Sequence, residues 1–173
     1  LNGNWLQNHS KPDIEKPRLL YVGRMKIEKG IFSLLKIFGK MNSNVELSIA
    51  GKVENFTKIN NRKVNFLGYK KNILELINTY DKHNITILPS FTEAHPKVVD
   101  ESLARLRPVI IFEEIQHIVQ NKYGLFISKR DNKSLEETID FILRNYESIQ
   151  LDMKQNKLPT KQQFISEISK ILN

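Results

Sequence analysis

The sequence contains no cysteine and no long hydrophobic run, and both absences narrow what the protein can be. Without cysteine it has no disulfides and no thiolate metal ligands, which fits a reducing compartment such as the cytoplasm. No apolar run approaches the ~20 residues that a membrane-spanning helix needs. The four histidines show no metal-binding spacing, so no metal site is predicted. We expect a cytoplasmic protein.

What is present is a globular composition with an excess of positive charge. The 173 residues are 40% hydrophobic, enough for one domain with a real core. The net charge of +8 favours anionic partners such as nucleotides, phosphorylated lipids or a membrane surface. The alternative is a bias towards solvated lysines, since lysines are spread along the chain. No RNA-binding or zinc-finger signature accompanies them, so we expect no nucleic-acid partner.

Short apolar segments alternate with helical patterns along most of the chain. Strands are predicted at 18–22, 45–50, 64–67, 85–88, 108–112 and 125–128. Helices are predicted at 31–41, 73–80, 97–106 and 115–119, from a capping box at Ser134 onward, and at 161–172, with a polar loop at 52–62. This alternation predicts an α/β fold: a Rossmann-like parallel sheet with helices on both faces. We predict a domain at 17–146 between an arm or linker at 1–16 and a helical arm at 147–173. Because the sequence starts at Leu1 without methionine, we read it as cut from a longer protein.

A basic loop follows the first predicted strand, in the segment Val22-Gly23-Arg24-Met25-Lys26-Ile27-Glu28-Lys29-Gly30. Gly23 permits a turn, and Arg24 and Lys29 then lie at the strand's carboxyl end. An arginine and a lysine that converge there can neutralise a diphosphate. The segment is not a P-loop, because the Gly-x4-Gly-Lys-Ser/Thr pattern is missing. The alternative is an ordinary basic loop with a glycine at each end.

Two glutamates eight positions apart, Glu93 and Glu101, follow the strand at 85–88. A loop that leads from a buried strand into a helix is where α/β folds bind ligands. Glu101 then lies inside the helix, where its carboxylate can accept hydrogen bonds from a vicinal diol such as that of a ribose. Glu93, in the loop, can accept from sugar hydroxyls. The alternative is a solvated Glu93 and a surface pair between Lys97 and Glu101, which contributes little.

The start of the same helix is predicted to hold an anion. Pro96 suits the first helical position, which leaves the amides of Lys97 and Val98 as unpaired donors. His95 lies in the same segment and can reach a phosphate or a sugar. Gly51 and Gly68 each follow a predicted strand and permit a turn or close approach of a ligand.

Taken in order, these motifs resemble a known family. They read strand-Gly-Arg-x4-Lys-Gly, strand-Ala-Gly, Val-x-Phe-Leu-Gly, Leu-Pro-Ser-x2-Glu-x7-Glu-Ser-Leu-Ala and Arg-Pro-Val-Ile-Ile. Over residues 17–145 the chain is similar to the C-terminal, donor-binding domain of GT-B glycosyltransferases of the large retaining family 4, the glycosyl transferases group 1. The resemblance implies a nucleotide-diphosphate-sugar donor, used without a metal or other cofactor.

The resemblance also implies roles for individual residues. Arg24 and Lys29 match the pair that binds the donor diphosphate, and Glu93 matches the glutamate that contacts the transferred sugar, which makes these three the catalytic candidates. Glu101 matches the glutamate that holds the ribose. The remaining matches are to nucleotide-binding positions at the strand ends and at the helix start: Gly23, Gly51, Gly68, Tyr69, His95, Pro96, Lys97 and Val98.

The chain departs from the family at three places. Ala94-His95-Pro96 stands where the family usually has a glycine-rich segment, Arg107 replaces a glycine, and Glu113-Glu114-Ile115 replaces a glycine-rich loop. These departures leave the donor sugar open.

The family's enzymes have two such domains, and this chain has one. The resemblance therefore implies an N-terminal acceptor-binding domain of the same protein as partner, and we expect the chain alone to bind donor without turnover. The expected activity is sugar transfer with retention to a glycan or lipid-linked acceptor, as in polysaccharide biosynthesis, with contact to the inner face of a membrane left open. The alternatives are a non-catalytic nucleotide-sugar-binding module or inactive subunit, and a basic membrane-surface or nucleic-acid protein on an α/β scaffold.

Overall fold

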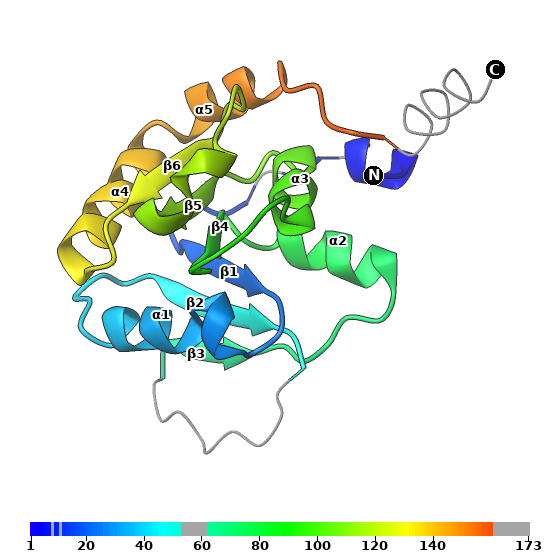
Figure 1. The fold of residues 1–173 in the computed structure, drawn as a ribbon. Helices are drawn as coiled ribbons and strands as arrows, with labels where there is room; N and C mark the ends of the chain where they lie inside the picture. The colour runs from blue at the N-terminus through cyan, green and yellow to red at the C-terminus, as the bar shows by residue number, and fades with distance from the viewer. Residues whose placement is uncertain (8, 11, 53–61, 161–173) are drawn as a thin grey trace.

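The computed structural model describes residues 1–7, 9–10, 12–52 and 62–160. Within these ranges the chain forms a six-stranded, fully parallel sheet flanked by helices (Figure 1). The strands are β1 (Arg18–Val22), β2 (Glu46–Ala50), β3 (Val64–Phe66), β4 (Ile85–Leu88), β5 (Val109–Phe112) and β6 (Leu125–Ser128). The α-helices are α1 (Ile31–Phe38), α2 (Ile73–Asp81), α3 (Lys97–Ala104), α4 (Asn132–Arg144) and α5 (Tyr146–Met153). Short 3₁₀ helices are η1 (Gly3–Leu6), η2 (Ile27–Lys29) and η3 (Glu113–Ile118).

The strand order is β3-β2-β1-β4-β5-β6, which confirms the predicted Rossmann-like fold. From β1 the chain continues to β2 and β3 towards one edge of the sheet, and from β4 it continues to β5 and β6 towards the other edge. The strand order therefore reverses between β1 and β4. In β1, Leu19 pairs with both Leu47 of β2 and Ile85 of β4. The carboxyl ends of β1 and β4 therefore open a crevice in which ligands bind in open α/β sheets.

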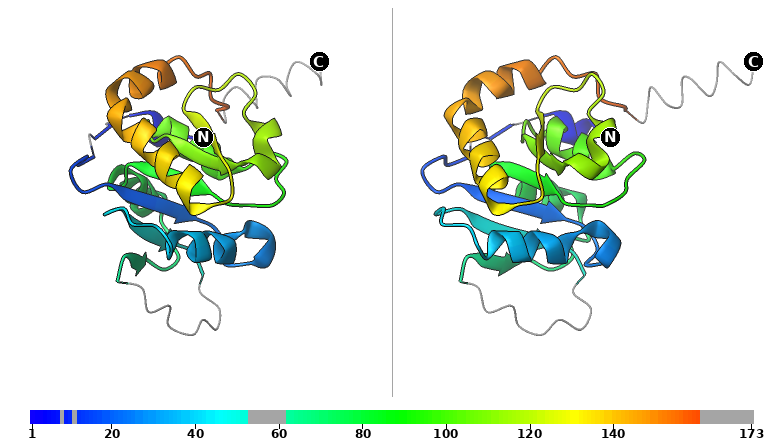
Figure 2. Two further views of the ribbon diagram at one scale, coloured as in Figure 1. Left: turned by 90° about the vertical axis from the view of Figure 1, so that its left-hand side faces the viewer. Right: turned by 60° about the vertical axis from the view of Figure 1, so that its left-hand side comes forward.

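Alternation along the central strands divides the core into two layers. Leu19 and Tyr21 of β1 pack in the larger cluster with α1, whereas Leu20 packs in the smaller one with Ile77 and Tyr80 of α2. All five side chains are buried. Figures 1 and 2 show α1 and α4 on one face of the sheet and α2 on the other. Helices on both faces explain why β4 and β5 are buried along their whole length.

The structure corrects one predicted helix start, that of α4, and the placement of Pro96 at the start of α3. Helix α4 begins at Asn132 because the Asp131 side chain, and not that of Ser134, caps it: Asp131 Oδ1 accepts from the Ser134 amide at 2.8 Å. Ser134 Oγ instead accepts from the Lys129 amide at 2.9 Å. Helix α3 begins at Lys97, and Pro96 is the residue before it, with extended backbone (φ −75°, ψ 114°).

The N-terminal arm packs against the domain. Trp5 in η1 is 3% exposed, and its ring meets that of Tyr80 edge-on, with centroids 5.6 Å apart. The predicted helix at 161–172 and most of the predicted loop at 52–62 lie outside the described residues. No helix in the described ranges is long and apolar enough to cross a membrane.

Two arginines that are 1% exposed hold this arm in place. Arg105 donates from Nε and Nη2 to the two oxygens of Asp81, at 2.8 Å each, and from Nη1 to backbone carbonyls of the arm. Arg107 donates to the carbonyl oxygens of Ser10 and Tyr80. Arg107, which replaces a family glycine, thus has a structural role in fixing the arm.

Candidate functional site

The loop after β1 and the loop after β4 meet at the crevice through charged side chains. Lys29 Nζ donates to Glu93 Oε1 at 2.6 Å, and Ser90 Oγ donates to the same oxygen at 2.7 Å. The Glu93 side chain is 11% exposed and that of Lys29 27% exposed. A lysine and a glutamate 64 positions apart are therefore brought together at the edge of the site, still within reach of solvent.

The backbones of these two loops are fixed against each other. Gly30 has a left-handed conformation (φ 66°), and a Cβ there would lie 1.8 Å from the carbonyl oxygen of Pro89. The Phe91 amide donates to the Glu28 carbonyl at 3.1 Å. Only glycine permits this approach at position 30, so the loop that carries Lys29 is held against the loop that carries Glu93.

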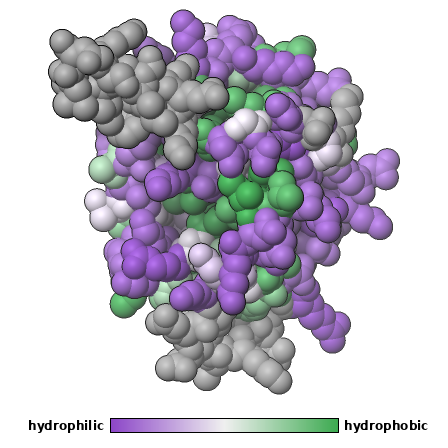
Figure 3. Space-filling model, turned by 90° about the vertical axis from the view of Figure 1, so that its right-hand side faces the viewer, coloured by the Kyte–Doolittle hydropathy of each residue, from purple (hydrophilic) through white to green (hydrophobic). Residues whose placement is uncertain are grey.

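A cavity of about 350 Å³ opens beside the loop after β1, at the ends of β1 and β2. Its lining includes four residues predicted to bind the donor, Gly23, Arg24, Gly51 and Tyr69. The other lining residues are Val22, Ala50, Lys52, Lys70 and Leu76. This size lies within the range of small-molecule sites. Figure 3 shows a hydrophobic patch surrounded by hydrophilic side chains on the face towards which β1 and β2 point in Figure 1.

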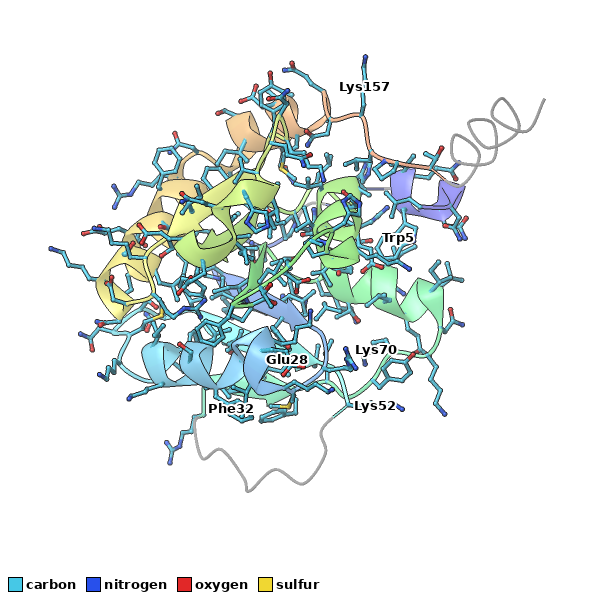
Figure 4. All side chains as sticks on the ribbon, viewed as in Figure 1. Trp5, Glu28, Phe32, Lys52, Lys70 and Lys157 are labelled. Atoms are coloured by element: carbon cyan, nitrogen blue, oxygen red, sulfur yellow. The ribbon has the colours of Figure 1, made fainter. Side chains whose placement is uncertain are left out.

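Tyr69 and two lysines form one side of this cavity. Lys52 Nζ lies 5.6 Å from the centre of the Tyr69 ring, and Tyr69 is 59% exposed. Lys52 and Lys70 both line the cavity, and Figure 4 labels them on this side of the molecule. Sequence reasoning missed both lysines, although each directly adjoins a residue that it did identify.

Gly51 and Gly68 bring the loops around the cavity together. A Cβ on Gly51 would lie 1.9 Å from the carbonyl oxygen of Gly23, and the Gly51 amide donates to the Gly68 carbonyl at 3.1 Å. Gly51 is therefore required for backbone-to-backbone packing. Gly68 has a left-handed φ of 68°. Gly68 does not line the cavity, but the residue that follows it, Tyr69, does.

Glu101 lies on α3 and points towards α2. Its Oε2 accepts a hydrogen bond from the Tyr80 hydroxyl at 2.9 Å. Burial raises the pKa of Glu101, and the Tyr80 hydroxyl and the Lys97 ammonium oppose that increase. No ion pair between Lys97 and Glu101 is found in the described part of the chain, so the surface-pair alternative does not hold.

The start of α3 carries the other predicted anion-binding residues. Within the described residues, the amides of Lys97 and Val98 have no acceptor, as expected for the first turn of a helix. His95 Nε2 lies 3.1 Å from Asp100 Oδ2, and Lys122 Nζ donates to Asp100 Oδ1 at 3.0 Å. Asp100 therefore holds the exposed His95 ring beside the helix start, a contact that the sequence did not predict.

Arg130 is a residue with several contacts near the site that sequence reasoning missed. Its guanidinium lies between two rings, 4.1 Å from the centre of Phe91 and 4.3 Å from that of Phe112. Nη1 donates to the Pro89 carbonyl at 3.0 Å, and Nε donates to Glu114 at 2.7 Å. This hydrogen bond lowers the pKa of Glu114. Arg130 thus ties the end of β6 to the loops after β4 and β5, and Glu114, a departure from the family pattern, supplies its partner.

The described residues contain no group of three histidine or carboxylate side chains arranged to hold a metal ion. The chemistry that the site offers is cationic and hydrogen-bonding: Arg24, Lys29 and the helix amides for an anion, and Glu93 and Glu101 for hydroxyl groups.

Comparisons with known proteins agree with this fold. A family model described as "Glycosyl transferases group 1" matches residues 6–159. Curated protein sequences give no significant match. Among solved structures, the chain is similar to sucrose-phosphate synthase from Thermosynechococcus elongatus, with 22% identity and a TM-score of 0.64 over 83% of this chain and 45% of that one. It is also similar to HepE from Anabaena, in complex with UDP and glucose, with 15% identity and a TM-score of 0.63 over 80% and 42% of the two chains.

A third similar structure is a single domain. The catalytic domain of cholesterol-α-glucosyltransferase from Helicobacter pylori has 19% identity and a TM-score of 0.64, and the match covers 80% of this chain and 93% of that one. By contrast, the chain spans less than half the length of the sucrose-phosphate synthase and HepE chains. At these identities the likeness establishes the fold.

Proposed function

The chain belongs to the glycosyl transferases group 1 family, and from this membership we propose that it is the donor-binding half of a GT-B glycosyltransferase. The proposed reaction transfers a sugar from a nucleotide-diphosphate sugar, with retention as in family 4, to a glycan or lipid-linked acceptor. The single observation that carries the proposal is the meeting of Lys29 and Glu93 at the switch point of the sheet, 2.6 Å apart and accessible to solvent.

The proposed chemistry depends on charge that develops on the leaving group. When the bond between the sugar and the diphosphate breaks, negative charge grows on the diphosphate oxygens. Arg24, Lys29 and the first amides of α3 are fixed donors that stabilise this charge. Such a cationic clamp can act without a metal ion, and we propose that it does. Retention is proposed to proceed by front-face attack of the acceptor, with no role for Glu93 as acid or nucleophile.

In the same proposal, donor binding rearranges the pair that Lys29 and Glu93 form in the unliganded chain. Lys29 Nζ moves to a diphosphate oxygen, and Glu93 Oε1 is released to accept from a hydroxyl of the transferred sugar. Ser90, which donates to the same oxygen, keeps the carboxylate in place during the exchange. The nucleoside enters the cavity beside Tyr69, and its ribose hydroxyls bind Glu101.

The acceptor site is proposed to lie on a second, N-terminal domain. The sucrose-phosphate synthase and HepE chains are about twice as long as the region they share with this chain. We therefore propose that this chain alone binds the donor without transferring sugar. The alternative, a non-catalytic nucleotide-sugar-binding module, would bind the same ligands. It would differ from the proposed enzyme in that the chain joined to its N-terminal domain would not transfer sugar.

The first experiment is a thermal shift of the chain with UDP, GDP and ADP and with their sugar conjugates. A ligand at about 100 times its dissociation constant stabilises by about 2.7 kcal/mol, which is a shift of a few degrees at this size. We expect a shift with one nucleotide that is lost in Lys29→Ala and in Glu101→Ala. Lys26→Ala is the matched control, because Lys26 lies on the same loop but pairs with the exposed Glu28. The absence of a shift with every nucleotide at millimolar concentration would contradict the proposal.

A further inference from the structure

Among the described residues, the carboxylate of Glu101 has one hydrogen-bond partner, and that partner comes from a different helix. Tyr80, at the end of α2, donates its hydroxyl to Glu101 Oε2 at 2.9 Å. Within the part of the chain that the structure describes, no hydrogen-bond partner is found for Oε1. One carboxylate oxygen is thus held by the protein and the other is left to accept from a ligand.

Tyr80 is itself held rigidly. The Tyr80 side chain is fully buried. The backbone carbonyl oxygen of Tyr80 accepts a hydrogen bond from Arg107 Nε at 3.3 Å. The Trp5 ring packs against the Tyr80 ring edge-on. The backbone of Trp5 accepts from Arg105 Nη1 at 3.0 Å. A chain of contacts therefore leads from the N-terminal arm through Trp5 and Tyr80 to Glu101.

We infer that Tyr80 is a positioning residue for donor binding: its hydroxyl fixes the Glu101 carboxylate so that Oε1 faces the ribose. This inference rests on the proposed function, in which Glu101 accepts from the ribose hydroxyls. A flexible glutamate would lose side-chain entropy on binding a diol, whereas one already held by Tyr80 does not. Trp5 contributes by keeping the Tyr80 ring in place.

The hydrogen bond from Tyr80 also favours the charged form of Glu101. Burial raises the pKa of the Glu101 carboxyl, and the hydrogen bond from Tyr80 lowers it. The other charged groups that face Glu101 are Lys97 and Asp100 on its own helix and the amino group of Leu1 on the arm. Burial and the charge of Glu101 raise the pKa of Tyr80 well above its ordinary value, so the hydroxyl keeps its proton and remains the donor.

The test compares two tyrosine-to-phenylalanine variants. Tyr80→Phe removes the hydroxyl that Glu101 accepts from. Tyr146→Phe is the matched control, because Tyr146 is also buried and also donates to one acceptor, the Asn84 carbonyl at 2.6 Å, at the amino end of β4. Affinity is measured by calorimetry for UDP, GDP and ADP and for the 2′,3′-dideoxy form of each, from pH 5 to pH 8.

We expect Tyr80→Phe to weaken ribonucleotide binding about tenfold, the equivalent of one hydrogen bond to a charged group. Binding of the dideoxy nucleotides should change little, because they lack the hydroxyls that Glu101 accepts from. The pH below which ribonucleotide binding falls should move upward in Tyr80→Phe, since Glu101 then takes up a proton more readily. Tyr146→Phe should bind like the unchanged chain. Trp5→Leu should give a smaller loss with the same preference for ribose over dideoxyribose.

Three outcomes would overturn the inference. If the unchanged chain binds a ribonucleotide and Tyr80→Phe binds it equally, with the same pH dependence, Tyr80 does not position Glu101 and the proposed function stands. An equal loss for ribose and dideoxyribose forms would assign Tyr80 a general structural role. No binding by the unchanged chain would remove the proposed function together with this inference. Trp5→Leu, measured in the same way, keeps the test decisive if Tyr80→Phe fails to fold.

Discussion

Two groups of charged side chains lie at opposite ends of the sheet, and they are built differently. At the amino ends of β4 and β5, Arg105 and Arg107 are 1% exposed and bind Asp81 and backbone carbonyls. At the carboxyl ends of β1 and β4, the Lys29 and Glu93 side chains are 27% and 11% exposed. Charges enclosed and bonded on every side hold a fold together, whereas charges left within reach of solvent can exchange one partner for a ligand.

This difference separates structure from function where the sequence alone does not. Both groups consist of cations beside a carboxylate, and the chain carries a net charge of +8. The Arg105 guanidinium binds its carboxylate through two parallel hydrogen bonds, which a ligand could displace only by leaving buried charges unpaired. Lys29 makes one bond to Glu93 and can move on its flexible side chain. The following predictions test whether the two groups differ in this way.

The largest effect is expected at the buried group. Asp81→Ala leaves the guanidinium groups of Arg105 and Arg107 buried without their carboxylate, and it should lower the free energy of unfolding by roughly 3 to 5 kcal/mol. Denaturant unfolding measures this change. Lys29→Ala, in the exposed group, should change the same free energy by less than about 1 kcal/mol. Similar losses of unfolding free energy for both variants would mean that the buried and the exposed group do not differ in their contribution to stability.

The next effect concerns pH and a buried histidine, His83, whose pKa is lowered by burial and also by the charge of Arg107 in the buried group. His83 Nδ1 lies 2.6 Å from the Thr79 carbonyl, and burial lowers the pKa of His83 to about 4. The ordinary value of about 6.5 applies to the unfolded chain. Between these values the unfolded chain binds a proton that the folded chain does not. The free energy of unfolding should therefore fall by roughly 3 kcal/mol as the pH drops from 6.5 to 4.

His83→Gln tests this assignment, because glutamine does not titrate. Unfolding measured at several pH values should lose much of its dependence in this range, while nucleotide binding keeps its own dependence on Glu101. If the variant retains the full pH dependence, other groups are responsible.

A smaller effect is expected at Arg130, which contacts the loop that carries Glu93 of the exposed group. Arg130→Ala removes the contacts to the Pro89 carbonyl and to the rings of Phe91 and Phe112, which hold the loop that carries Glu93. Affinity for a nucleotide sugar should fall about tenfold, equivalent to about 1.4 kcal/mol, and more than affinity for the nucleotide alone. Calorimetry with both ligands measures the difference. Arg130→Lys should restore little, because lysine lacks the planar fork that stacks and binds Glu114.

The smallest effect is expected at a charged pair outside both groups. Lys133 Nζ and Glu137 Oε1 are 4.0 Å apart on α4, and their side chains are 84% and 68% exposed. Glu137→Gln should change the free energy of unfolding by less than about 0.5 kcal/mol and leave nucleotide binding unaltered. A larger change would mean that exposure does not rank the charged pairs of this protein.

The sequence by itself determined the fold class and the positions of the site loops. Short apolar runs predict strands, and apolar residues spaced three or four apart predict helices, because side chains repeat about every 2 residues in a strand and about every 3.6 in a helix. The alternation of these segments, with glycine or proline at their ends, predicts a parallel α/β sheet. The sequence placed Arg24, Lys29, Glu93 and Glu101 after the correct strands. Helix ends were less predictable: Asp131 rather than Ser134 caps α4, since both residue types can cap and only the path of the chain selects one.

Only the tertiary structure decided which side chains meet. Lys29 and Glu93, Tyr80 and Glu101, and Arg130 and Phe91 are each separated by tens of residues, and the strand order β3-β2-β1-β4-β5-β6 determines which of their loops are neighbours. The same order buries Arg105 and Arg107 and exposes Arg24, although all three are arginines. Local sequence patterns indicate whether a segment is a helix or a strand, whereas the burial and the contact partners of a side chain depend on which elements pack together.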